Sequence, residues 1–290
     1  MTLAADPRTI LDFAAAPPRA GAATIEVVRA EPARRWRLVL LAWLLPLAAL
    51  VAAEAAGRLG WVTSNLLPTP SDVARALVEL GWHTVAVHVA ASTLRVVAGY
   101  AIGALLALAV GSFVGLSATA RALLDPTFQA LRAIPSLAWV PLLLLWLGIG
   151  EAPKLAMIAI GSFFPIYMGV ASGIRGVDRK LVEVAQLMRL GAFALVRRVL
   201  LPAALPSVLT GLRNGLSLAW MFMVAGELIA ASSGLGYLLT DGRETSRADL
   251  VLAAIVLLAV LGKLSDTAMA RLERRLLSWR DVFGAQGDAR

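Results

Sequence analysis

The fold is decided by the stretch VDRKLVEVAQLMRLGAFALVRRVLLPAALP, which runs from Val177 to Pro206. Long apolar runs flank it on both sides, yet it carries charged side chains at Asp178, Arg179, Lys180, Glu183, Arg189, Arg197 and Arg198. A single charge held at the centre of a bilayer costs about 3 kcal/mol. The stretch therefore projects into water between two membrane spans, and we expect it on the cytoplasmic side.

The first half of this segment has the pattern of an amphipathic helix. Leu181, Val184 and Met188 recur at helical spacing on one face, with Ala185 beside them, while the charged residues fall on the other faces. Such a helix either docks on a partner or packs back on the bundle as a solvated loop.

The second half predicts a turn followed by a return to the membrane. We expect the turn near Gly191, and then a second short helix that carries Arg197 and Arg198. Pro202 and Pro206 mark the re-entry into the next span.

Composition places the rest of the chain in a membrane. Of 290 residues, 59% are hydrophobic and 16% charged, against about 45–50% and about 25% in an ordinary soluble domain. We therefore predict an all-α polytopic membrane protein of about six transmembrane helices. The expected spans are Leu38 to Ala56, Ala98 to Leu116, Ile134 to Ile149, Leu155 to Ile174, Val208 to Ala231 and Leu250 to Ala270.

The basic residues report topology. With the N-terminus inside, the cytoplasmic segments hold about 19 Lys and Arg, and the outer loops hold about five, as the positive-inside rule requires. We expect cytoplasmic N- and C-termini, contact with membrane lipid, and no nucleic-acid partner. Residues 1–35 are predicted to be a flexible tail, 36–272 the transmembrane domain and 273–290 a second tail. The chain has no cysteine, which excludes disulfides and thiolate metal sites.

The second apolar run is too long for one span. As a single helix, Thr84 to Ser117 would extend about 50 Å, beyond a hydrocarbon core of about 30 Å. We expect the part before Arg95 to emerge on the outer side. A ridge of small residues follows, which predicts close helix packing, either within the bundle or at a seam between two subunits. The ridge consists of Gly99, Gly103, Ala107, Gly111 and Gly115.

Two further local patterns carry predictions. Pro135, Pro141 and Pro165 lie in apolar runs and predict kinked helices. In the outer segment after the first span, Thr69-Pro70-Ser71-Asp72 has the form of a capping box, which predicts a short helix that begins at Pro70.

The register from Glu183-x-Ala185 to Leu201-Pro202 resembles the cytoplasmic signature loop of binding-protein-dependent ABC importer permeases, written EAA-x3-G-x9-I-x-LP. The resemblance extends from about Leu59 to Trp279 and includes ALRAIPSLAWVPL and GIRGVDRKLVEVA, which are most similar to aliphatic sulfonate permeases. There are two departures: Val184 replaces an alanine, and Arg189 stands where the signature glycine falls.

The resemblance implies a type I ABC importer permease fold and a set of partners. A separate cytoplasmic ATPase would bind ATP and Mg, and would receive the loop from about Asp178 to Arg198, with Leu181, Val184, Ala185 and Met188 at the contact. A periplasmic binding protein would deliver the solute, and two permease copies would pair. The implied substrates are aliphatic sulfonates, in sulfur assimilation, with taurine, nitrate or another small anion as alternatives. The chain itself shows no ATP site, since Gly262-Lys263-Leu264-Ser265 lacks the first glycine of a P-loop.

The candidate translocation pathway or gate is formed by Arg95, Glu227, Ser232 and Ser233. Arg95 near the outer end of a span is either a functional group or a snorkelling side chain. Glu227 either pairs with a basic group or stabilises an outer gate, and the polar turn around Ser232 and Ser233 is either part of the outer mouth or an ordinary loop.

No enzymatic site is expected. His83 and His88 are the two histidines and lie on different helix faces, so no catalytic residue or metal ligand is assigned. The alternative from another class is an ion-coupled secondary carrier, which would favour two similar halves. No such internal repeat is seen in the sequence.

Overall fold

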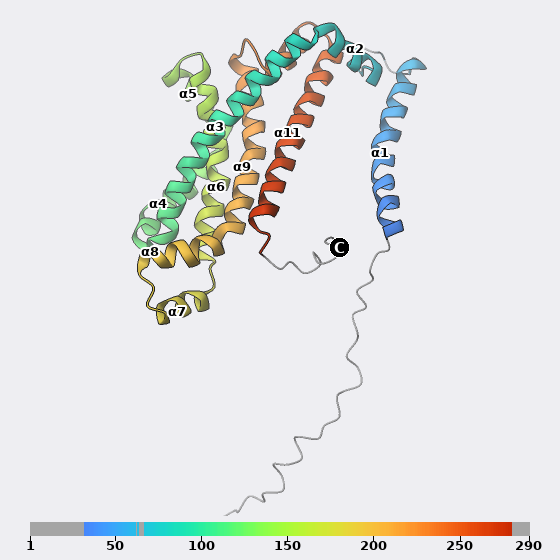
Figure 1. Cartoon of the computed structure of the whole chain (residues 1–290). Coiled ribbons are helices and arrows are strands. Elements are labelled where there is room, and N and C mark those ends of the chain that lie inside the picture. Colours follow the sequence, from blue (N-terminus) through green and yellow to red (C-terminus); the bar gives the residue numbers. More distant parts are fainter. Residues whose placement is uncertain (1–31, 62, 64–66, 280–290) are drawn as a thin grey trace, which may run out of the picture. The chain divides into compact units, whose positions relative to one another are not determined.

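The computed structural model describes residues 32–61, 63 and 67–279, and the regular structure in these ranges is helical (Figure 1). The elements are α1 (Pro32–Arg58), α2 (Pro70–Leu80), α3 (Trp82–Leu116), α4 (Ala118–Ala133), η3 (Ser136–Trp139), α5 (Val140–Leu147), α6 (Glu151–Arg175), α7 (Arg179–Leu187), α8 (Ala192–Leu195), η4 (Val196–Leu200), α9 (Leu201–Ala230), α10 (Leu235–Glu244) and α11 (Ala248–Leu276).

The chain divides into two units, Met1–Val51 and Ala52–Arg290, with the boundary inside α1. The described part of the first unit is the beginning of α1, and the predicted span Leu38 to Ala56 lies within this helix. Residues 1–31 of the predicted N-terminal tail and 280–290 of the predicted C-terminal tail lie outside the described residues. Residues 32–35 are already helical, and the final helix α11 continues to Leu276.

Within the described ranges, four helical segments are long and apolar enough to cross a membrane, or five when the bent pair α4 and η3–α5 counts as one span. The four are Trp82–Leu116, Glu151–Arg175, Ala192–Ile229 and Ala248–Leu276. This confirms the all-α, multi-span class expected from the apolar runs.

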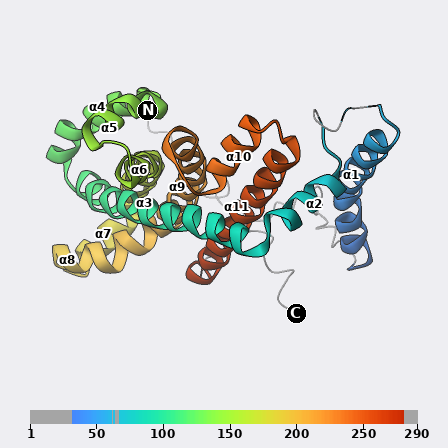
Figure 2. The same ribbon diagram turned by 90° about the horizontal axis from the view of Figure 1, so that it is seen from above.

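Helix α6 forms the centre of the second unit. It packs against α3 on one side and α9 on the other, as the view in Figure 2 shows. The core along α6 consists of fully buried apolar side chains, among them Ile158, Ile166, Tyr167 and Val170. In a membrane, apolar faces need no cover from other helices, so the close packing of α6 with α3 and α9 depends on the fit of small residues at both contacts.

The small-residue ridge of α3 lies against α6 of the same chain. A Cβ at Gly99 would lie 2.6 Å from Cβ of Ile158, and a Cβ at Gly111 would lie 2.9 Å from Cβ of Val170. Gly103 faces Ser162, and Gly115 faces Ile174. The two backbones therefore approach as closely as small-xxx-small packing permits.

Helix α3 runs without a break through Arg95. It is one helix of 35 residues, about 52 Å long at about 1.5 Å per residue. His88, Ser92 and Arg95 are spaced so that they share one face, and that face is buried against polar partners. These partners hold the first part of α3 against α9 and the turn before α10. Figure 1 shows α3 crossing the bundle obliquely, which accommodates its length.

The predicted third span, Ile134 to Ile149, coincides with the η3–α5 segment, which is the second half of a bent pair that begins with α4. Helix α4 and the η3–α5 segment meet at 90° around Ile134 and Pro135. Proline cannot donate a backbone hydrogen bond and restricts the preceding residue to extended conformations. Ile134 accordingly has φ −74° and ψ 123°. Pro141 begins α5, and Pro165 lies inside α6.

The charged segment also differs from expectation after α7. The predicted second short helix does not stand alone, because α8 continues through the π-helical stretch Val196–Leu200 into α9. Pro202 lies in the first turn of α9 and Pro206 inside it. Proline has no N–H to donate to the carbonyl one turn earlier, and a local π-helix can accommodate this missing hydrogen bond.

The predicted cap of the outer helix α2 is confirmed. Thr69 Oγ1 accepts a hydrogen bond of 3.2 Å from the backbone of Asp72, and the Thr69 backbone donates to the Asp72 carboxylate at 3.1 Å. The Thr69 hydroxyl also donates to that carboxylate, and together these bonds hold the pKa of Asp72 below its usual range. Ser71 donates from its backbone and hydroxyl to Glu54 of α1, which ties the start of α2 to the end of α1.

Candidate functional site

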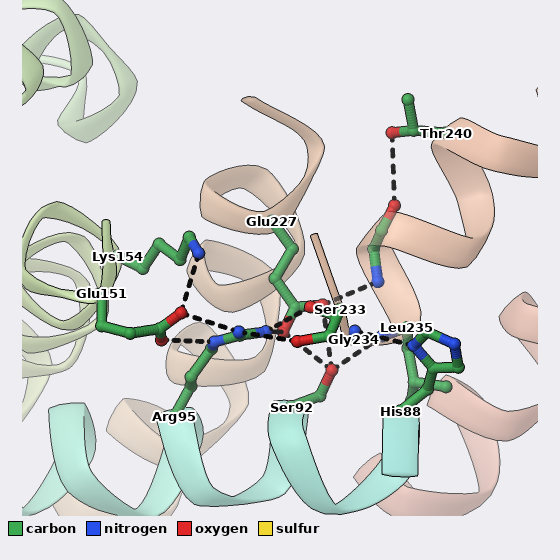
Figure 3. Close-up of polar contacts among 11 residues, drawn as sticks. His88, Ser92, Arg95, Glu151, Lys154, Glu227, Ser233, Gly234, Leu235 and Thr240 are labelled. Carbon is green, nitrogen blue, oxygen red and sulfur yellow. Dashed lines mark hydrogen bonds and ion pairs between the residues drawn. The ribbon is translucent and has the colours of Figure 1, made fainter. Parts of the chain in front are cut away.

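A group of charged and polar side chains joins three helices at one end of the bundle, and we call it the Arg95 cluster: Arg95, Glu151, Lys154, Glu227 and Ser233 (Figure 3). Glu151 is half exposed, and the other charged members are buried. Arg95 comes from α3, Glu151 and Lys154 from the start of α6, Glu227 from the end of α9, and Ser233 from the turn before α10. The side chain of Arg95 is 9% exposed and that of Glu227 is fully buried.

The Arg95 guanidinium is fully engaged. Nε and Nη2 donate to the two oxygens of Glu151 at 2.6 and 2.8 Å, and Nη1 donates to Glu227 at 2.6 Å. Nη1 also donates to the carbonyl of Ser233, and Nη2 to its hydroxyl. Each N–H of the guanidinium thus has an acceptor within the protein, because the planar fork can serve two carboxylates at once.

The charges of the cluster balance. Lys154 Nζ donates to Glu151 at 3.0 Å, so two cations face two carboxylates. Removing one member of a buried pair leaves an uncompensated charge, which costs about 3–5 kcal/mol. The cluster therefore couples α3, α6 and α9 strongly as long as it is complete.

Side chains of α3 and α9 also cap the N-terminus of α10. Backbone N–H groups of Gly234, Leu235 and Gly236 donate to His88 Nδ1, Ser92 Oγ and Glu227 Oε2, at 2.9, 2.8 and 2.7 Å. Because the first N–H groups of a helix have no partner inside it, these side chains supply the acceptors. The acceptor role of Nδ1 implies that neutral His88 carries its proton on Nε2.

Glycine is required in this turn. Gly234 has φ +123°, where an L side chain is strained, and a Cβ there would collide with the Glu227 carboxyl group. A Cβ at Gly236 would lie 2.6 Å from Cβ of Glu227. The tight turn and the buried carboxylate thus depend on each other.

The structure brings together three of the four predicted pathway or gate residues, Arg95, Glu227 and Ser233. Ser232 is exposed at the beginning of the same turn. Sequence reasoning missed Glu151, Lys154, Ser92 and His88. The spacing of His88, Ser92 and Arg95 on one face of an otherwise apolar helix was the available signal.

At the other end of α6 lies the charged segment Val177–Pro206. Helix α7 starts after Asp178, whose side chain accepts from the Lys180 backbone at 2.9 Å. Arg179 and Glu183 pair on its exposed face at 2.8 Å. Since α6 has 25 residues, about 37 Å separate its two ends. The Arg95 cluster and α7 therefore lie on opposite sides of the membrane-spanning bundle.

The apolar face predicted on α7 is exposed in this chain. Leu181 is 48% exposed and Met188 70%, and Val184 is similarly open, whereas Ala185 is buried at 2%. Ala185 therefore anchors the helix to its own chain, and the larger side chains point outward. An exposed apolar stripe on a short projecting helix is typical of a helix-in-groove contact.

Arg189 forms the turn that ends α7. Its φ is +52°, and the Leu190 and Arg189 amides donate to the carbonyls of Ala185 and Gln186 at 3.1 and 2.9 Å, the pattern of a Schellman cap. Gly191, where we expected the turn, is extended with φ −65°. The turn thus stays at the signature position, although a non-glycine residue there costs about 1–2 kcal/mol.

The fold and these two sites define a class of protein. A bundle of membrane spans that projects a short amphipathic helix at one side, with a buried charge cluster near the other, is the architecture of a transporter's membrane subunit. The chain matches the family model of the binding-protein-dependent transport system inner membrane component over residues 86–278. It belongs to this family.

Individual relatives of the chain support this family assignment. The chain is 40% identical over 259 residues to the putative aliphatic sulfonates transport permease protein SsuC of Bacillus subtilis, covering 89% of this chain and 94% of the relative. It is 39% identical to SsuC of Escherichia coli, covering 88% and 97%. It is 36% identical to the taurine transport system permease protein TauC of Escherichia coli, covering 75% and 82%.

A solved structure supports the fold. The permease chain in an inward-facing structure of the MetNI methionine ABC transporter matches with a TM-score of 0.60 and 22% identity, covering 68% of this chain and 98% of that one. The chain is therefore the permease subunit of an ABC importer, a multi-pass protein of the inner membrane with the type I fold. It works with an ATPase subunit, which binds the nucleotide, and with a substrate-binding protein. Its own role is transport. Among the described residues no group of His, Asp and Glu is placed to hold a metal.

Proposed function

We propose that this chain imports aliphatic sulfonates, as the permease of an ATP-driven transporter supplied by a periplasmic binding protein. The observation that carries the proposal is the 40% and 39% identity to the two sulfonate permeases over nearly the full length of both chains. Taurine, itself a sulfonate, is the second candidate because of the 36% identity to the taurine permease. Nitrate and other small anions are more distant alternatives.

We further propose that α7 and its flanking loop, about residues 177–206, couple transport to ATP hydrolysis. The exposed apolar side chains of Leu181, Val184 and Met188 would enter a groove of the ATPase. Asp178, Arg179, Lys180 and Glu183 remain in water around this face. The Arg189 turn and the continuous α8–α9 helix, which includes Pro202, would transmit movement of α7 to the membrane spans.

The Arg95 cluster is proposed as an outer gate. Its support is the geometry: the cluster joins α3, α6, α9 and the turn before α10 on the side opposite α7. Every guanidinium donor is already used, so Arg95 is better suited to hold helices together than to bind a passing anion.

We also propose a dimeric assembly and an orientation in the membrane. Two copies of the chain would pair around a shared pathway, with both termini in the cytoplasm and with residues 36–272 as the transmembrane domain. The excess of basic residues in the predicted cytoplasmic segments supports this orientation.

The test is transport by the reconstituted complex. The permease, its ATPase and its binding protein are placed in proteoliposomes, and uptake of ethanesulfonate, taurine and nitrate is measured with and without ATP. We expect ATP-dependent uptake of ethanesulfonate ahead of the others. Uptake by the permease alone, driven by an ion gradient, would instead favour a secondary carrier.

A further inference from the structure

A groove of about 1010 Å³ runs along the exposed side of α6 and α9, apart from the Arg95 cluster. Its lining on α6 extends from Gly161, near the middle of that helix, to Ser172, close to the end that leads into α7. On α9 it extends from Ala203 to Phe222. The groove therefore occupies the half of the bundle nearer to α7.

One wall of this groove is unexpectedly polar for a membrane span. Ser207, Thr210 and Asn214, here called the polar stripe, follow one another at intervals of three and four residues, so they share a face of α9. All three are exposed in the chain. They lie inside the segment Ala192–Ile229, which is long and apolar enough to cross a membrane.

Asn214 shows that this face does not meet lipid. Thr210 satisfies its hydroxyl by donating to the Pro206 carbonyl at 3.0 Å, a bond that hydrocarbon tolerates. In the described part of the chain the Asn214 amide makes no such bond. Exposing an unpaired amide to an apolar medium costs about 2–7 kcal/mol. The stripe must therefore face water, a solute or another polar surface.

The electrostatics of the groove favour an anion. Among the described residues that line it, Arg132 is the one charged side chain, and the lining contains no carboxylate. The Asn214 amide and the Ser207 hydroxyl can donate hydrogen bonds to sulfonate oxygens without holding a fixed charge. Such neutral donors suit a pathway, since a solute must be bound firmly enough to enter and weakly enough to leave.

The rest of the lining is apolar, and we call it the apolar wall. Phe164 and Met168 of α6 belong to it, and Leu218, Met221 and Phe222 continue the lined face of α9 beyond Asn214. A surface with hydrogen-bond donors in one part and apolar side chains next to them fits a polar head joined to a short alkyl chain. It fits nitrate, which has no apolar part, less well.

We propose that this groove is the solute-binding surface of the permease. The polar stripe binds the sulfonate head, the apolar wall contacts the alkyl chain, and Arg132 supplies a positive charge that attracts the anion into the groove. This inference rests on the proposed function. It places the solute contacts on α6 and α9, whereas Arg95 and Glu227 serve as structural links at the opposite end.

The absence of cysteine in the chain gives a direct test. Asn214→Cys and Thr210→Cys are made singly in the assembled transporter and treated with the anionic thiol reagent sulfonatoethyl methanethiosulfonate. Leu105→Cys, at an exposed position of α3 that does not line the groove, is the control. We expect both groove variants to react and the control to remain unmodified. Ethanesulfonate should slow the reaction of the groove variants.

Two results would overturn the inference. The first is reaction of Asn214→Cys no faster than that of Leu105→Cys in a complex that transports ethanesulfonate. The second is a disulfide that forms between two copies of the Asn214→Cys chain and that ethanesulfonate does not affect, since the stripe would then be a subunit seam.

A second measurement separates failure of the groove from failure of the proposed function. In Asn214→Leu we expect ethanesulfonate uptake to fall about tenfold, while ATPase binding and stimulation of ATP hydrolysis by the loaded binding protein are retained. Thr267→Ala, which removes a hydroxyl of α11 outside the groove lining, should leave uptake unchanged. Normal uptake by Asn214→Leu would show that the groove is not the solute-binding surface, while leaving the proposed sulfonate transport intact. If the unaltered complex takes up no sulfonate, the proposed function itself is wrong.

Discussion

Arg95 on α3 and Glu227 on α9 form a buried ion pair, with Nη1 and Oε1 2.6 Å apart and 132 positions between them in the sequence. The same carboxylate accepts from Ser92 and from the backbone of Gly236. One side chain thus joins two membrane helices to the start of a third helix. The stability of this end of the bundle depends on that carboxylate.

Replacing Glu227 should therefore be severe. Glu227→Ala leaves Arg95 with Glu151 as its one carboxylate and removes an acceptor from the α10 turn, so we expect a loss of about 3–5 kcal/mol in the free energy of unfolding. The measurement is thermal unfolding of the purified permease in detergent. Glu244→Ala, at an exposed position of α10, should change stability by less than about 0.5 kcal/mol. Equal melting temperatures for the two variants would contradict the role given to Glu227.

Gly234→Ala should damage the same region through the backbone. The residue has φ +123°, and an added Cβ would collide with the Glu227 carboxyl group, so we expect a loss of about 1–3 kcal/mol in stability together with reduced transport. Gly262→Ala is the matched control, because a Cβ there meets nothing within 4 Å. In the interior of a helix that change should raise stability by about 0.5–1 kcal/mol. The measurement is thermal unfolding of both variants. An unchanged melting temperature for Gly234→Ala would show that the turn can relax to accept a Cβ.

The sequence predicts the local features of the fold better than it predicts the Arg95 cluster. The α2 cap follows from Thr69 and Asp72, which are three residues apart, and the amphipathic face of α7 follows from its spacing. The partners of Arg95 lie 56 and 132 positions away, so their meeting depends on how α3, α6 and α9 pack. The partners of His88 and Ser92 were missed for the same reason, because they lie in the turn before α10 and on α9, 135 or more positions away.

The bend before η3 shows a related limit. Pro135 marks a disturbed helix in the sequence, and this much was predicted. Whether the chain kinks slightly or turns through 90° depends on what packs beside it. Proline fixes the loss of a hydrogen bond but does not fix the direction in which the chain continues.

The exposed face of α7 gives a test of coupling. Leu181 is 48% exposed, so Leu181→Arg should leave the permease folded but place a charge in the ATPase groove. We expect the ATPase no longer to copurify and stimulated ATP hydrolysis to fall about tenfold or more. Gln186→Arg adds the same charge on the opposite face of α7 and should have little effect. Unchanged copurification with Leu181→Arg would mean that α7 is not the contact.

The α2 cap predicts a dependence on pH. Hydrogen bonds from the Thr69 hydroxyl and backbone lower the pKa of Asp72 in the folded protein. A carboxylate with a lowered folded pKa stabilises the fold above its unfolded pKa, and this contribution disappears as the pH falls through the folded value. The melting temperature of the unaltered protein should exceed that of Asp72→Asn by a constant amount above about pH 5 and by less below about pH 4. A difference that does not depend on pH would show that the charge of Asp72 is irrelevant.

Substitutions at Arg189 can distinguish the backbone strain of the turn from a direct role of the arginine side chain in coupling. Arg189 holds φ +52°, a conformation that glycine adopts without the cost that other residues incur. Arg189→Gly should therefore stabilise the end of α7 by about 1 kcal/mol and slow hydrogen exchange of the Arg189 and Leu190 amides, which form the cap. Arg189→Val should have the opposite effect, since a β-branched residue is especially strained there. Coupling to the ATPase should survive in the glycine variant if Arg189 serves only as a turn. Loss of stimulated ATP hydrolysis in a better-protected Arg189→Gly loop would instead show that the guanidinium itself contacts the ATPase.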